Sequence, residues 1–134
     1  MLIRTDVSNI GDPFILNDNN HYYMYCTDFD VEGFKVRISD DLYHWETLGI
    51  ALDLSNSWAY KSFWAPEVVK HKDKYVMHYT ARRKDNNELR IGVAISDKPI
   101  GPFKDVHNGP MFELGYAVID GHVLKDNDDY YHLR

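Results

Sequence analysis

Short apolar segments separated by polar turns run along the whole chain, and helical periodicity is hard to find. No window of about 11 residues keeps apolar positions at i, i+3, i+4 and i+7 without a turn signal inside it. Strand-like segments dominate instead: Phe14–Leu16, His21–Cys26, Phe34–Ile38, Val68–Val69, Tyr75–Tyr79, Leu89–Ile95, Val118–Leu124 and Tyr130–Leu133. Strands joined by short polar turns at regular spacing predict an antiparallel all-β fold.

The chain also repeats itself at offsets of 53 and 55 residues, without a gap inside the aligned segments. The three copies are Asp12–Leu16 with Tyr22–Thr27, Ala65–Val69 with Tyr75–Thr80, and Asp120–Leu124 with Tyr130–Arg134. About four short strands in each such period are typical of the blades of a β-propeller, where sheets stack around an axis because one sheet cannot bury both faces alone. A β-sandwich would explain the strands but not the gapless repeat.

The length of the chain sets how much of a propeller it can form. Propellers have roughly 4 to 8 blades, whereas 134 residues hold about two and a half of these periods. We expect a single partial propeller domain over residues 1–134, with blade 1 over about 10–60, blade 2 over about 61–115 and the start of blade 3 over about 116–134. Such a chain is expected to be the N-terminal part of a larger propeller, or to self-associate through its open blade edges.

Composition and charge narrow the classes of function. The chain has 15 Lys and Arg against 21 Asp and Glu, a net charge of −6, which argues against a nucleic-acid or anionic-membrane surface. No apolar run approaches the roughly 20 residues of a membrane-spanning helix. Met1–Ile10 contains no continuous apolar stretch, so we expect no signal peptide and a cytoplasmic protein. The single cysteine, Cys26, excludes an internal disulfide.

The first position of each aligned segment carries candidate chemistry. In a propeller the innermost strand of each blade lines the central channel, so equivalent positions face a common axis. This position reads Asp12, Ala65 and Asp120, which predicts two carboxylates projecting toward one cavity. Paired carboxylates around a cavity are what the hydrolysis of a glycosidic bond requires. The alternative is that the two aspartates cap turns, before Pro13 and before Gly121.

Three ordered motifs that span nearly the whole chain carry a family resemblance. They are Asp12–Leu16 with Tyr22–Tyr25, Phe63–Val68, and Ile119–Val123 with the turn at Asp126–Tyr131. Together they resemble glycoside hydrolase family 43. Fructan-cleaving propeller glycosidases carry Asn-Asp-Pro, whereas this chain has Gly11-Asp12-Pro13, which favours family 43. The resemblance implies a five-bladed β-propeller and inverting hydrolysis of plant cell-wall pentose glycosides, such as those of arabinan, arabinoxylan or xylan.

The resemblance also implies roles for individual residues. Asp12 would match the general base that activates water, and Asp120 the second carboxylate, which orients the acid and raises its pKa. Trp64 would match the aromatic wall of a sugar subsite, and Phe29 a second hydrophobic wall. The general acid of the family is a Glu from a later blade, and no position in this sequence is assigned to it. We therefore expect the chain to be truncated before its acid.

Three of these side chains also have structural interpretations. Trp64 could pack between blades instead of binding sugar, and Glu67 could be an active-site carboxylate or a hydrogen-bonding residue of its strand. His122 shares a strand face with Asp120. It could contact the substrate, or a structural cation in the channel of the complete propeller, or it could hold a hydrogen bond there.

No motif for a phosphate, a dinucleotide or a metal ion is found in the sequence. We therefore expect an oligosaccharide or polysaccharide partner and no cofactor, catalytic metal, nucleic acid or membrane. The alternative function, from a different class, is a non-catalytic carbohydrate-binding or self-associating part of a propeller.

Overall fold

Ten strands and no helix make up the regular structure of residues 4–133, which are the residues that the computed structural model describes. Arg134, the last residue of the third aligned segment, lies outside them. A first sheet pairs β1 (Ile10–Asp18), β2 (His21–Asp28), β3 (Lys35–Ser39) and β4 (Glu46–Ile50) in that order. A second sheet pairs β5 (Ala59–His71), β6 (Lys74–Arg83), β7 (Leu89–Ser96) and β8 (Lys104–Asp105). A C-terminal hairpin pairs β9 (His122–Asp126) with β10 (Asp129–Leu133).

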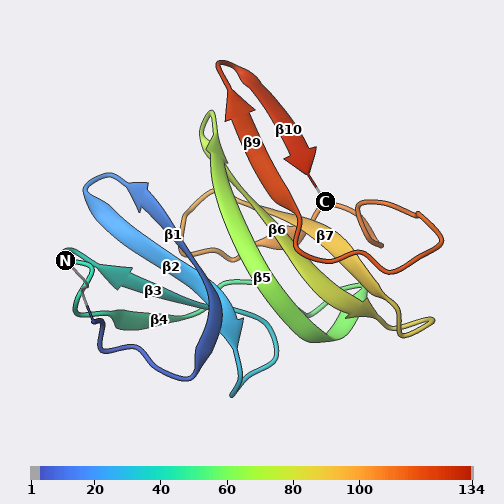
Figure 1. Cartoon of the computed structure of the whole chain (residues 1–134), viewed down its shortest axis with the longest axis horizontal. Helices are drawn as coiled ribbons and strands as arrows, with labels where there is room; N and C mark the ends of the chain where they lie inside the picture. Colours follow the sequence, from blue (N-terminus) through green and yellow to red (C-terminus); the bar gives the residue numbers. More distant parts are fainter. Residues whose placement is uncertain (1–3, 134) are drawn as a thin grey trace.

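The sequence repeat returns as a repeat of strand register. Every strand pairs antiparallel with its neighbour, and the first two strands of each unit are joined by a two-residue turn. Equivalent pairs of residues face each other in all three units: Phe14 with Tyr25, Glu67 with His78, and His122 with Leu133. The expectation of an antiparallel all-β fold is therefore confirmed, and Figure 1 shows the two four-stranded sheets side by side, with the hairpin beside β5 and β6.

The interior lies between the first and second sheets and is rich in aromatic rings. Phe34 and Phe63 meet edge to face with ring centroids 5.9 Å apart, and Tyr25 and Phe103 do the same at 6.0 Å. Phe34, Tyr25 and Phe103 are fully buried. Edge-to-face pairs add about 0.5–1.5 kcal/mol each beyond the burial of their area. The two sheets are thus joined by one continuous core.

An ion pair between the buried Asp18 and the partly exposed Lys70 crosses the same interface. The carboxylate of Asp18, at the end of β1, accepts a hydrogen bond from Lys70 Nζ at 2.6 Å and another from the Tyr75 hydroxyl at 2.5 Å. Burial alone would raise the pKa of Asp18, but these two hydrogen bonds outweigh it and hold the pKa below its ordinary value. Asp18 therefore fixes the first sheet to β5 and β6 while ionised.

The strand prediction differs from the structure in three places. β5 has 13 residues where only Val68–Val69 was expected. The expected strand at Val118–Leu124 begins only at His122, because the residue at 120 has a left-handed backbone (φ 57°) and its N–H bonds to a side chain instead of a sheet partner. The strands β4 and β8 were not expected, since every residue of β4 is exposed and β8 is two residues long. The predicted blade boundaries near residues 61 and 116 stay a prediction.

Candidate functional site

The first position of each repeat has the same unusual backbone. Asp12, Ala65 and Asp120 have φ values of 46°, 44° and 57°, in the left-handed region that residues with a side chain seldom adopt. In β1 and β5 this residue and the proline after it form a β-bulge, which interrupts the register with the next strand. Proline has no N–H to donate to a ladder, so the pairing breaks there. The bulge re-aims the side chain at the same point of each sheet.

Two buried threonines hold these positions in place. The Thr27 hydroxyl donates to Asp12 Oδ2 at 2.8 Å and accepts a hydrogen bond from the N–H of Ala65 at 2.9 Å. The Thr80 hydroxyl, at the equivalent place in β6, accepts from the N–H of Asp120 at 3.0 Å. Each threonine thus links one repeat to the next.

A continuous series of hydrogen bonds and strand pairings connects Asp12 to Asp120. Asp12 is joined through Thr27 to the residue that follows Trp64, and Trp64 pairs in the ladder with Thr80, which in turn binds Asp120. Both carboxylates lie on exposed residues. The alternative interpretation, in which Asp12 caps a local turn, does not fit the backbone, because residue 12 lies inside a bulged strand.

An exposed aromatic ring lies next to Asp12. Phe29 is 64% exposed, and a Cβ added to Gly11 would lie 3.3 Å from its Cζ, so the ring covers the backbone just before Asp12. Trp64 is half-buried beside Ala65. Apolar ring faces beside polar groups suit the stacking of a sugar, whose faces are apolar and whose edge is hydroxylated. The assignment of Phe29 and Trp64 to sugar subsites stays a prediction.

His122 contacts Glu67, the other side chain for which the sequence left two interpretations open. Its Nδ1 lies 2.7 Å from Glu67 Oε2, across the interface between the second sheet and the hairpin. The imidazole remains half-exposed, whereas the carboxylate is mostly covered. A hydrogen bond was one of the interpretations of His122, and this contact is such a bond. The same contact uses one carboxylate oxygen of Glu67.

Sequence reasoning missed Thr27 and Thr80. The signal was present, because both Tyr-rich repeats end in threonine at the same distance from their first tyrosine. Among residues 4–133 no group of three or more His, Cys, Asp or Glu is placed to hold a metal ion. Within the same range no helix is long and apolar enough to cross a membrane.

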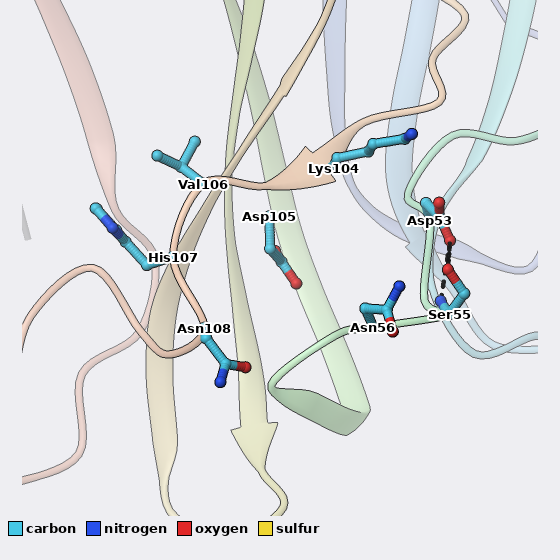
Figure 2. A pocket seen from close by; sticks show the side chains of 8 residues that line it. All are labelled: Asp53, Ser55, Asn56, Lys104, Asp105, Val106, His107 and Asn108. Atoms are coloured by element: carbon cyan, nitrogen blue, oxygen red, sulfur yellow. Dashed lines mark hydrogen bonds between the residues drawn. The ribbon is translucent and has the colours of Figure 1, made fainter.

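A separate hollow lies at the β8 edge of the second sheet, as Figure 2 shows. It has a volume of about 380 Å³ and is lined by Asp53, Ser55, Asn56, Lys104, Asp105, Val106, His107 and Asn108. Its half-buried carboxylate, Asp105, accepts hydrogen bonds from the hydroxyls of Ser57 and Tyr79, and partial burial raises its pKa. None of the predicted site residues lines this hollow.

The chain belongs to the glycosyl hydrolases of family 43, whose family model matches residues 7–133. It is 36% identical over 121 residues to a xylosidase/arabinosidase of Bacteroides ovatus, an alignment that covers 87% of this chain and 34% of that protein. The crystal structure of a thermostable family-43 glycoside hydrolase superimposes with a TM-score of 0.86 and 39% identity, over 96% of this chain and 42% of that one.

A third relative was solved with a sugar bound. It is a β-xylosidase/α-arabinofuranosidase from a compost microbial metagenome, in complex with xylotriose, with a TM-score of 0.77 and 29% identity over 96% of this chain and 43% of that chain. The expected β-propeller fold is thereby confirmed. The chain spans about a third of the length of the Bacteroides relative and less than half of the two solved chains.

Proposed function

We propose that this chain carries part of the active site of an inverting glycoside hydrolase that cleaves pentose glycosides of plant cell walls. Its relatives bear the names of xylosidases and arabinosidases. The observation that supports the proposal best is the equivalence of Asp12 and Asp120. They occupy the same position of two repeats and share the same left-handed backbone. Thr27 of β2 binds the carboxylate of Asp12, and Thr80 of β6 binds the N–H of Asp120.

Asp12 acts in this proposal as the general base. Its Oδ2 accepts a hydrogen bond from the Thr27 hydroxyl, and its Oδ1 makes no hydrogen bond to another described residue. The free oxygen takes a proton from water as that water attacks the anomeric carbon. Inverting enzymes keep the base and the acid about 6.5–9.5 Å apart to leave room for this water.

Asp120 acts in this proposal on the general acid, and it does not contact the glycosidic bond. Its carboxylate makes no hydrogen bond to another described residue, so it is available to a neighbouring group. A carboxylate beside a protonated Glu raises the pKa of that Glu by like-charge repulsion and keeps it an acid near neutral pH. In this proposal no Glu of this sequence is assigned to the acid.

The test is hydrolysis of aryl α-L-arabinofuranosides and aryl β-D-xylosides by the polypeptide that the complete gene encodes. We expect release of p-nitrophenol from at least one of them, and a fall on the order of 10³-fold or more in kcat for Asp12→Asn, since the base is lost while the shape is kept. Asp126→Asn, at the exposed end of β9, is the matched control and should retain the activity.

Two outcomes would contradict the proposal. Turnover that survives Asp12→Asn would exclude Asp12 as the base. Binding of xylo- or arabino-oligosaccharides without turnover, unchanged in Asp12→Asn, would indicate a non-catalytic carbohydrate-binding protein instead.

A further inference from the structure

We propose that Thr27 is the positioning residue of the general base, and this inference rests on the function proposed above. Its hydroxyl lies between a side chain of the first sheet and the backbone of the second. A hydroxyl has one proton to donate and two lone pairs to accept with. Because the N–H of Ala65 points at the oxygen, the hydroxyl proton is directed to Asp12 Oδ2.

The backbone on both sides of Thr27 is fixed by a buried cluster. Arg37 Nη1 lies 3.0 Å from the sulfur of Cys26, and Arg37 Nη2 lies 2.6 Å from Asp28 Oδ1. The second carboxylate oxygen of Asp28 accepts the N–H of Lys35 at 2.8 Å. All the charged atoms of this cluster are buried, so they hold one geometry. Thr27 is therefore presented to Asp12 from a rigid support.

Thr80 provides an internal comparison for this role. It occupies the same place in β6 and accepts the N–H of Asp120 as Thr27 accepts that of Ala65. The first position of its own repeat is Ala65, which has no carboxylate to receive its proton. Both threonines link successive repeats, but only Thr27 also orients a carboxylate. The two roles can therefore be separated by the same substitution at two sites.

The experiment measures kcat, KM and the thermal midpoint for Thr27→Val, Thr27→Ser and Thr80→Val in the complete protein. Thr27→Val should lower kcat on the order of 10²-fold, because a displaced catalytic group costs about that much. KM should change by less than about threefold, since the interaction acts in the transition state. Thr27→Ser keeps the hydroxyl and should return kcat to within about threefold of the wild type.

Thr80→Val separates positioning from stability. It removes an equivalent bond between repeats, so its thermal midpoint should fall about as far as that of Thr27→Val, while its kcat falls clearly less. A Thr27→Ser variant as slow as Thr27→Val, or a Thr27→Val variant that keeps the kcat of the wild type, would show that Thr27 does not position Asp12 and would overturn the proposal.

A wild-type protein without hydrolytic activity would contradict the proposed function rather than this inference alone. In that case crystal structures of the wild type and Thr27→Val decide. The carboxylate of Asp12 should leave its wild-type rotamer in the variant, and an unchanged carboxylate in both structures would overturn the positioning role.

Discussion

The first and second sheets meet over aromatic rings and an ion pair, whereas the second sheet and the C-terminal hairpin meet over histidines. The first interface contains Phe34, Phe63 and the Asp18–Lys70 pair. In the second, His71 packs edge to face on Tyr130 at 4.8 Å, and the rings of His78 and His132 lie 5.0 Å apart. The two interfaces join equivalent repeats, yet one is largely apolar and the other is largely titratable.

This difference bears on the proposed site, because Asp12 belongs to the first interface and Asp120 to the second. The first sheet packs on the second through an aromatic core whose side chains do not change charge near neutral pH. The hairpin that follows Asp120 packs on the second sheet through His78, a buried imidazole whose pKa is lowered by its burial. Acid is therefore expected to loosen the neighbourhood of Asp120 before that of Asp12.

The largest effect should come from opening the aromatic interface. Phe34→Ala removes a fully buried ring and leaves a cavity, so we expect the free energy of unfolding to fall by about 3–5 kcal/mol. Urea unfolding followed by fluorescence measures this. Phe29→Ala is the matched control, because that ring is 64% exposed and its loss should cost little stability. Equal losses in both variants would contradict the position of the core.

A smaller effect should come from the histidine interface, and it depends on pH. Burial, helped by the charge of His132, lowers the pKa of His78 to about 4. The unfolded chain takes up this proton near pH 6.5 and the folded chain only near pH 4, so stability is lost as the pH falls between these values. The loss reaches at most about 3 kcal/mol.

His78→Leu should flatten the pH dependence of stability between pH 6.5 and pH 4. Amide exchange in β10, which packs on this histidine, should accelerate on acidification in the wild type and not in the variant. The exposed His107 gives the matched control, His107→Leu, which should leave the slope in place. A wild-type stability that is constant over this range would contradict the assignment.

The smallest effect of the three should come from the ion pair of the first interface. Asp18→Ala leaves the buried Tyr75 hydroxyl without its acceptor, which costs about 1–3 kcal/mol. The contribution is present above about pH 4, the ordinary pKa of Asp, and is lost as the pH falls through the lowered pKa of Asp18. Asp97→Ala, which breaks the exposed pair with Lys74, should change the midpoint of urea unfolding far less.

The repeat made much of the fold predictable, because a gapless repeat of sequence implies a repeat of register. It located Asp12 and Asp120 as equivalent positions and placed Trp64 beside Ala65. The alternation of apolar and polar residues did not predict strands correctly where a strand is fully exposed or where a residue has a left-handed backbone. β4 shows no alternation because all its residues are exposed, and the segment before His122 reads as a strand but contains a left-handed residue.

The role of Thr27 could not be read from hydrophobic pattern, since a buried threonine near the end of a strand has many uses. What singles it out is a hydrogen bond to Asp12, 15 residues earlier, and another from Ala65, 38 residues later. Such contacts depend on how one sheet lies against the next. The contact of His122 with Glu67 was hidden for the same reason, because it spans 55 residues.

A crystal structure of the complete protein soaked with xylotriose or an arabino-oligosaccharide is the most direct measurement. We expect a sugar ring between the carboxylates at residues 12 and 120, with the anomeric carbon facing the former across one water molecule and an aromatic ring of Phe29 or Trp64 beside it. Sugar bound only in the hollow of Figure 2, or two carboxylates that open onto separate cavities, would contradict the account.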